Sequence, residues 1–326
     1  MNAVPKPTVS LVLGSGGARG YAHIGAIEEL LAQGYEIRSI AGASMGALIG
    51  GVHAAGKLDA YRDWVRELQK LDVFRLLDWT FSGGGLIKGD RIVDKLRDLI
   101  GEMSIEDLPI AYTAVAVDLI AEREVWFSRG SLFDAIRASI AIPTVFRPHR
   151  YEGRVLVDGG LLNPVPITPT LRDLTDCTIA VDLNAPAESP HSISADAPID
   201  PAQIEVVSDG VPIVADVPPA QEDEPASAPG YKQKLTELFG GLLEKREKKA
   251  DEVADTGLLE TFARSLDVVQ ATITRFKLAA QPPDLLVPIP RNAAAFYEFH
   301  RADEMIEFGR VRMRAALRDF KPGHKP

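Results

Sequence analysis

The stretch GASMGA, residues 42–47, lies between two apolar runs and contains a serine flanked by glycines. The run before it, EIRSIA, has the composition of a buried strand, and the run after it, MGALIGGVHAA, has that of a helix. Ser44 with Gly42 and Gly46 therefore matches the G-x-S-x-G pattern of a nucleophile elbow, in which a serine projects from a tight strand-to-helix turn. The two glycines avoid a clash with neighbouring backbone, and the helix dipole favours negative charge near the serine. The alternative is an ordinary glycine-rich turn whose serine has no chemical role.

The same alternation of strand and helix extends in both directions from this turn. TVSLVL (8–13) predicts a buried strand, and YAHIGAIEELLAQ (21–33) has apolar residues at helical spacing. Strand, helix, strand and helix in quick succession indicate parallel strands joined by right-handed crossovers. The predicted strands are 8–13, 36–41, 110–119, 124–128, 154–157, 178–183 and 284–289, and the predicted helices are 21–33, 45–55, 131–140, 258–279 and 300–317. The sequence thus predicts one α/β domain with a long excursion.

A second glycine-rich turn, LGSGGARG (13–20), follows the first predicted strand. Adjacent parallel strands end at one edge of a sheet, so this loop and Ser44 are expected to face the same ligand site. The backbone N–H groups of Gly16, Gly17 and Ala18 are expected to point at an anion, with Arg19 adding positive charge; losing one such donor to an oxyanion typically costs ~3 kcal/mol. The alternative is phosphate binding, but the lysine of a Walker loop is missing and the third glycine of a dinucleotide fingerprint comes one residue late.

A serine hydroxyl is a poor nucleophile until a base takes its proton, and the sequence offers two kinds of base. The candidate histidines are His23 and His53, both inside predicted helices, and His149 in a predicted loop. The acids that close apolar strands are Asp118, Asp158 and Asp182. Asp158 alone is followed by two glycines, which allow a sharp turn toward another loop, although Asp-Gly turns are common. The spacing leaves the choice open.

The net charge of −10 is concentrated in one segment of the 326 residues. Residues 186–230 contain nine acidic residues, nine prolines and no lysine or arginine, and the rest of the chain carries a net charge of −1. Such a segment cannot bury much surface, so we expect a disordered or loosely held insertion. The remainder has no basic patch or motif for nucleic acid, and we expect no nucleic-acid partner.

Other features of the sequence limit the class of protein. No apolar run approaches the ~18 residues of a membrane span, and the amino end has no secretion-signal pattern. Cys177 is the single cysteine, which excludes an internal disulfide and a cysteine-rich metal site. A cytoplasmic location, with contact at the membrane periphery as an option, is therefore expected.

Four segments in chain order resemble the patatin-like phospholipases, and in particular their bacterial single-domain branch. They are GSGGARGYAHIGAIEEL, GASMGAL, RASIAIPTVFRPH and VDGGLLNPVP, and SLDVVQATITRFKLAAQPPDLLVPIP also looks familial. The resemblance covers residues 9–184 and about 258–312. It implies a three-layer α/β/α fold with a mainly parallel central sheet. One catalytic domain then spans 8–185 and 257–320, and residues 186–256 form a partly disordered acidic insertion followed by a charged amphipathic helix.

The resemblance also implies a catalytic serine–aspartate dyad without a histidine. Ser44 matches the nucleophile and Asp158 the general base, while Gly16, Gly17 and Arg19 match the G-G-x-R of the oxyanion hole. The implied reaction is hydrolysis of a fatty acyl ester through an acyl-enzyme, with no metal or cofactor. Because an ordinary carboxylate is a weak base, Asp158 should be desolvated and in direct contact with Ser44.

Two further segments are hypotheses about reaching a lipid. Residues 71–90 predict a lid or a wall of an acyl-chain channel, lined by Phe74, Leu77, Trp79 and Phe81, or else a buried helix and loop. Residues 231–249 have the spacing of an amphipathic helix flanked by basic residues, which suits an anionic membrane; two glycines and three glutamates favour a linker or dimer contact instead.

The expected function is hydrolysis of phospholipid or lysophospholipid acyl esters. The alternatives are a general carboxylesterase for short soluble esters and a non-catalytic lipid-binding regulatory protein. Head group, chain length and oligomeric state are not predicted.

Overall fold

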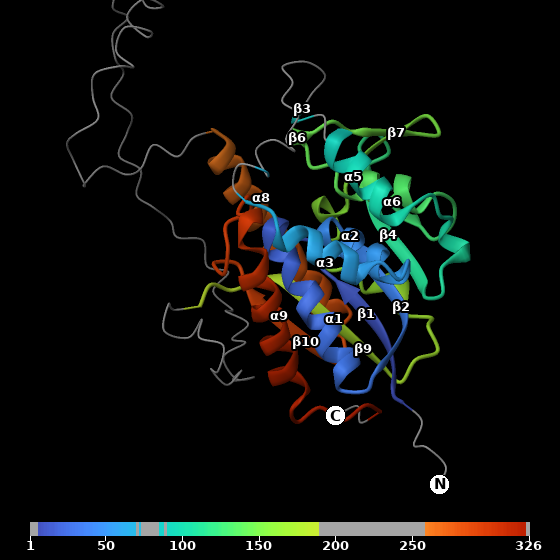
Figure 1. The fold of residues 1–326 in the computed structure, drawn as a ribbon. Helices are drawn as coiled ribbons and strands as arrows, with labels where there is room; N and C mark the ends of the chain where they lie inside the picture. The colour runs from blue at the N-terminus through green and yellow to red at the C-terminus, as the bar shows by residue number, and fades with distance from the viewer. Residues whose placement is uncertain (1–5, 70–71, 73–84, 88–89, 189–257, 324–326) are drawn as a thin grey trace, which may run out of the picture. The chain divides into compact units, whose positions relative to one another are not determined.

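A computed structural model describes residues 6–69, 72, 85–87, 90–188 and 258–323 (Figure 1). The chain divides into two units, one formed by Met1–Ile199 with Thr261–Pro326 and the other by Asp200–Glu260, and the first is described below. The four side chains predicted to line an acyl channel and the amphipathic segment 231–249 lie outside the described residues, as does nearly all of the predicted insertion.

An eight-stranded sheet forms the centre of the described unit, in the order β10-β9-β1-β2-β4-β8-β7 with β5 paired to β4. The parallel strands are β1 (Thr8–Leu13), β2 (Glu36–Ala43), β4 (Ala111–Asp118), β9 (Cys177–Ala185) and β10 (Leu285–Pro290). The strands antiparallel to their neighbours are β5 (Arg123–Phe127), β7 (His149–Tyr151) and β8 (Arg154–Asp158). A separate pair joins β3 (Gly85–Ile87) and β6 (Thr144–Phe146).

Helices cover both faces of this sheet. They are α1 (Ala22–Ala32), α2 (Met45–Ala54), α3 (Leu58–Arg66), α5 (Asp90–Ile100), α6 (Leu132–Ser139), α8 (Leu258–Ala280) and α9 (Ala302–Leu317). A short 3-10 helix, η1 (Gly17–Tyr21), precedes α1, and another, η3 (Gly159–Leu161), follows β8. In Figure 1, α1 and α9 lie side by side on one face of the sheet.

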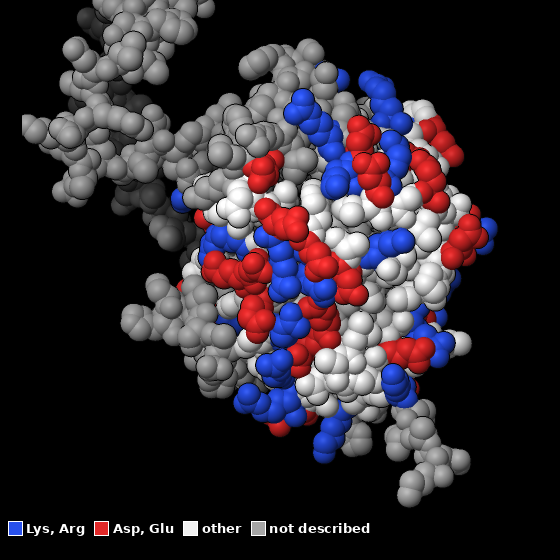
Figure 2. All heavy atoms as spheres, viewed as in Figure 1, with Lys and Arg blue, Asp and Glu red and all other residues white. Residues whose placement is uncertain are grey.

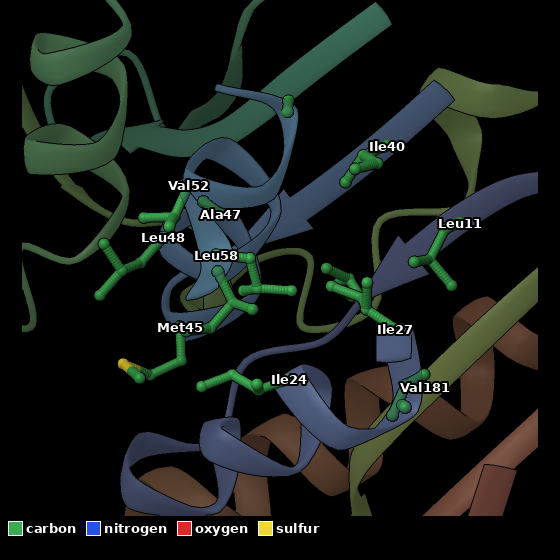
Figure 3. Packing of buried hydrophobic residues seen from close by; sticks show 14 of the residues in the cluster. Leu11, Ile24, Ile27, Ile40, Met45, Ala47, Leu48, Val52, Leu58 and Val181 are labelled. Carbon is green, nitrogen blue, oxygen red and sulfur yellow. The ribbon is translucent and has the colours of Figure 1, made fainter. Parts of the chain in front are cut away.

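The side chains of β1 show why two layers of helices are needed. Alternate residues of a strand point to opposite faces. Leu11 and Leu13 belong to the large core packed with α1, α2 and α9, where Figure 3 shows Leu11, Ile27 and Val181 between α1 and the sheet. Val12 points to a smaller apolar cluster on the opposite face, against which Leu278 of α8 packs. The predicted three-layer α/β/α fold with a mainly parallel sheet is confirmed.

The outer face of α1, α3 and α9 carries many acidic and basic side chains lying next to one another (Figure 2). Glu28 of α1 pairs with Arg62 of α3 and with Arg310 of α9, and Glu29 pairs with Arg314. These ion pairs tie three helices together over the large core.

The ends of β2 and β8 meet on one edge of β4, which positions the candidate site. β2 pairs with residues 111–115 of β4, and β8 pairs with residues 116–118, while β5 occupies the opposite edge along 114–118. β2 is parallel to β4 and β8 is antiparallel, so the two strands run toward each other. The last residue of each therefore lies beside the other: Ala43 pairs with Val115, and Asp158 with Ala116.

Most predicted elements lie within two residues of those in the structure, and β1 matches its predicted bounds. Helices α3 and α5 and the short strands β3, β6 and β7 were not predicted. Helix α3 did carry a signal, because its buried Leu58, Tyr61 and Val65 have helical spacing. Strands β3, β6 and β7 have three residues each, too few for alternation to be recognised.

Candidate active site

Ser44 lies in a strained turn between β2 and α2. Its backbone has φ 53° and ψ −122°, a conformation that residues other than glycine rarely adopt. A Cβ on Gly42 would be 2.4 Å from the carbonyl of Gly46, and a Cβ on Gly46 would be 1.9 Å from the Leu13 carbonyl oxygen. The turn therefore exists only with glycine at both positions, which is the steric condition that the G-x-S-x-G pattern predicts.

Ser44 and Asp158 are in direct contact, although they are far apart in the sequence. The Ser44 hydroxyl donates a hydrogen bond of 2.6 Å to Asp158 Oδ2, and Asp158 Oδ1 accepts one of 2.7 Å from the Gly160 N–H. The two side chains belong to residues that are 3% and 2% exposed. Burial disfavours the carboxylate and raises the pKa of Asp158 to about 7, although the bonds from Ser44 and Gly160 act in the opposite direction. A base with this pKa is half ionised at neutral pH.

Ser139 holds the backbone of the elbow, a role that the sequence did not suggest. Its hydroxyl accepts the Ser44 N–H at 2.9 Å and donates to the Val115 carbonyl of β4 at 2.6 Å. Ser139 is fully buried at the end of α6. Its only signal was its place inside RASIAIP, one of the family-like segments.

The glycine-rich loop that follows β1 is packed against the turns that carry Ser44 and Asp158. A Cβ on Gly46 would meet the carbonyl oxygens of Leu13 and Gly14, and a Cβ on Gly160 would be 2.5 Å from the Ser15 hydroxyl. The turns that carry Ser44, Asp158 and the loop therefore form one compact site at the carboxyl ends of β1 and β2.

The N–H groups of this loop fall into two sets. Those of Gly14, Ser15 and Ala18 donate to the carbonyls of Val181, Pro164 and Phe296 at 3.0, 2.8 and 2.9 Å. Those of Gly16 and Gly17 have no acceptor among the described residues. The expectation that the Ala18 N–H is free for an anion is therefore wrong, because Phe296 occupies it. Two of the predicted donors, at Gly16 and Gly17, are available.

Arg19 does not offer a free charge to an anion, which corrects a second expectation. Its side chain is fully buried, and Nε donates to the Gly16 carbonyl at 3.0 Å. Nη1 donates to the Arg291 carbonyl at 2.7 Å, and Nη2 forms a 2.7 Å ion pair with Asp267 of α8. All three nitrogens are thus committed to the protein, and the carboxylate of Asp267 neutralises the charge.

The other candidate bases serve local structure. His23 Nε2 bonds to the Gly14 carbonyl at 2.8 Å, and complete burial lowers its pKa to about 4, so it is neutral and donates from Nε2. His149 contacts Asp134. Asp118 accepts backbone N–H bonds from the turn that follows β4. Asp182 accepts the N–H of Asn184 within β9, and burial raises the pKa of Asp182 to about 6.

Within the described residues, no group of three or more His, Cys, Asp or Glu side chains is arranged to hold a metal ion. In the same part of the chain, every helix is too short or too polar to cross a bilayer.

A serine in a strained strand-to-helix turn, hydrogen-bonded to a buried aspartate at the end of a strand, is typical of a serine hydrolase site. The family model described as patatin-like phospholipase matches residues 11–171, which include both residues, and the chain belongs to the patatin-like phospholipase family. The resemblance seen in the sequence motifs is thus confirmed.

Relatives within the family differ widely in length. The chain is 41% identical to an uncharacterised NTE family protein of Mycobacterium tuberculosis, over 97% of this chain and 92% of that protein. It is 32% identical to the neuropathy target esterase sws of Drosophila virilis, over 49% of this chain but 11% of that protein. Among solved structures, VipD from Legionella pneumophila matches 55% of this chain and 50% of its own, at 17% identity and a TM-score of 0.43.

Proposed function

We propose that the protein is a serine hydrolase that cleaves fatty acyl esters of phospholipids or lysophospholipids through Ser44 and Asp158. The observation that carries the proposal is the 2.6 Å hydrogen bond between the two side chains, in a site where burial brings the pKa of the base to about 7. A family described as phospholipases, and a relative named as an esterase, support acyl ester hydrolysis as the reaction class.

The mechanism follows from the roles of these groups. Asp158 takes the Ser44 proton as the oxygen attacks the ester carbonyl, and the carbonyl oxygen becomes an oxyanion. The N–H groups of Gly16 and Gly17 stabilise this negative charge. The tetrahedral intermediate then collapses: the ester C–O bond breaks, Asp158 returns the proton to the departing alcohol, and an acyl-enzyme remains. Water, deprotonated by Asp158, attacks the acyl-enzyme, and the fatty acid leaves as Ser44 regains its proton.

A fluorophosphonate probe tests the nucleophile. Wild-type protein should be labelled at Ser44, and Ser44→Ala should be unlabelled and inactive on 1-palmitoyl lysophospholipid. Asp158→Asn should lower kcat by about 10²–10⁴-fold, as expected for loss of a general base. An unlabelled wild-type protein that hydrolyses no ester would refute the proposal and leave a non-catalytic lipid-binding protein.

Acyl-chain length and pH sharpen the test. A series of nitrophenyl esters should show higher kcat/KM for long chains than for acetate; the reverse order would favour a general carboxylesterase. Below about pH 7 the native Asp158 is protonated and cannot accept the serine proton, so kcat/KM should fall tenfold per pH unit. A rate that is flat from pH 5 to 8 would show that Asp158 is not the base.

A further inference from the structure

The directions of the Gly16 and Gly17 N–H groups are fixed by hydrogen bonds to the carbonyl oxygens of the same peptide units. A peptide unit is planar and trans, so its C=O and N–H point in opposite directions. The Gly16 N–H shares a peptide unit with the Ser15 carbonyl, and the Gly17 N–H shares one with the Gly16 carbonyl. Whatever holds these two carbonyls therefore aims the two N–H groups.

Both carbonyls are held by buried side chains from distant parts of the chain. Asn184 Nδ2 donates to the Ser15 carbonyl at 2.9 Å, and Arg19 Nε donates to the Gly16 carbonyl at 3.0 Å. Asn184 lies near the end of β9 and is 4% exposed. Each of the two peptide units thus has its carbonyl satisfied by protein and its N–H left without an acceptor among the described residues.

Arg19 is in turn held by α8. Its Nη2 pairs with Asp267, and one turn further along the same helix the buried Gln270 accepts a 2.9 Å bond from the Ser15 hydroxyl. These two residues belong to SLDVVQ, the family-like segment outside the matched range 11–171. Helix α8 therefore contacts the loop through the side chains of Asp267 and Gln270.

We propose that Asn184, and Asp267 acting through Arg19, are positioning residues that aim the Gly16 and Gly17 N–H groups at the oxyanion by holding the opposite ends of their peptide units. The inference rests on the proposed hydrolase function, because an oxyanion forms only in such a reaction. A further observation separates it from simple packing. Asn184 Oδ1 is buried and has no hydrogen-bond partner among the described residues, so this side chain is kept for its donor at a cost to stability.

The test uses Asn184→Ala and Asp267→Asn in the full chain, with p-nitrophenyl butyrate as a soluble ester. Both Asp267→Ala and Asp267→Asn remove the counter-charge of the buried guanidinium, but the asparagine keeps an acceptor oxygen and is the smaller threat to folding. Removing an oxyanion donor lowers kcat by about 10²–10³-fold, so a misaimed donor should lower it by about 10–100-fold with KM nearly unchanged. The pH midpoint of kcat/KM should stay near that of the wild type, since Asp158 is not altered.

Matched controls separate positioning from loss of stability. Thr274→Val removes a buried hydroxyl of α8 that has no partner among the described residues. Glu29→Gln removes the charge of another carboxylate that is paired with an arginine, on α1. Both controls should keep wild-type kcat, even where thermal denaturation shows a lower Tm.

A trifluoromethyl ketone inhibitor gives an independent readout, because its hemiketal oxyanion needs the same donors. Its Ki should rise in Asn184→Ala and Asp267→Asn by the factor that kcat/KM falls, and should not change in the controls. Wild-type kcat and Ki in both variants, with Ser44 still labelled, would overturn the positioning inference alone. A wild-type protein that is neither labelled nor active would overturn the proposed function and this inference with it.

Discussion

The nucleophile elbow and the glycine-rich loop are both turns between a parallel strand and a helix, yet they are held in different ways. The elbow is held by exclusion: Gly42 and Gly46 leave no space for a Cβ, and Ser44 is locked at φ 53°. The loop also excludes a Cβ at Gly16 and Gly17, but its peptide units are held in addition by hydrogen bonds from Asn184, Arg19 and the backbone of distant segments. The difference teaches that the turn at Ser44 can be recognised from five residues, whereas the direction of the Gly16 and Gly17 N–H groups depends on segments from distant parts of the chain.

The largest effect should come from adding one methyl group to the elbow. In Gly46→Ala the new Cβ lies 1.9 Å from the Leu13 carbonyl oxygen, which is backbone and cannot move without separating α2 from β1. We expect a loss of more than about 4 kcal/mol in the free energy of unfolding, or no folded protein at all. Urea denaturation followed by circular dichroism measures it.

Gly34→Ala is the control for this substitution. Gly34 ends α1 at φ 88° with no atom within 4 Å of a new Cβ, so the cost is limited to a strained backbone, about 1–2 kcal/mol. If the two variants were equally stable, exclusion could not be what holds the elbow.

The next largest effect concerns the stability cost of the buried Asp158 carboxylate beside Ser44. Burial raises the pKa of Asp158 from 3.8 to about 7, so the folded protein binds this proton more tightly than the unfolded chain. Stability is therefore lost as pH rises from about 4 to about 7. Asp158→Asn has no charge to bury and should be more stable than wild type by about 1–3 kcal/mol at pH 8, with the gain vanishing near pH 4.

Thermal denaturation at pH 4 and pH 8 measures this difference. Asp182→Asn is the matched control, because burial raises the pKa of Asp182 only to about 6, and its gain at pH 8 should be smaller. An Asp158→Asn variant less stable than wild type at pH 8 would mean that the ionised carboxylate stabilises the fold, which contradicts a net desolvation cost at this position.

The same contrast explains what the sequence could predict. β1, β2, α1 and α2 follow from local apolar spacing, and the elbow follows from three residue positions, Gly42, Ser44 and Gly46, within one five-residue pattern. The choice of Asp158 as base came only from the family resemblance. Asp158 lies beside Ser44 because β8 runs antiparallel to β4 and ends next to the end of β2 on the same edge of β4. Such strand pairing cannot be recognised from the local sequence.

Errors in the predicted site share one cause. Consecutive glycines do predict exposed N–H groups, but they cannot tell which of these are taken by other segments. Phe296 takes the Ala18 N–H, and Asp267 takes the charge of Arg19, and both lie more than 240 residues further along the chain. Ser139 was missed for the same reason, since its partners Ser44 and Val115 lie on other elements.

The smallest effect is expected at Ser139, whose hydroxyl accepts the backbone N–H of Ser44 from another element. Ser139→Ala leaves the buried Ser44 N–H without its acceptor and the Val115 carbonyl without the hydroxyl donor. We expect a loss of about 1–2 kcal/mol in stability. We also expect kcat to fall about tenfold, because the nucleophile is less well oriented.

Ser131→Ala in the same helix separates these two consequences. Ser131 caps α6 by accepting the Asp134 N–H at 3.1 Å, and removing such a cap costs about 1 kcal/mol without touching Ser44. The two variants should therefore have similar Tm values but different kcat values. Equal kcat in both would mean that steric exclusion at Gly42 and Gly46 orients Ser44 without help from the Ser139 hydrogen bond.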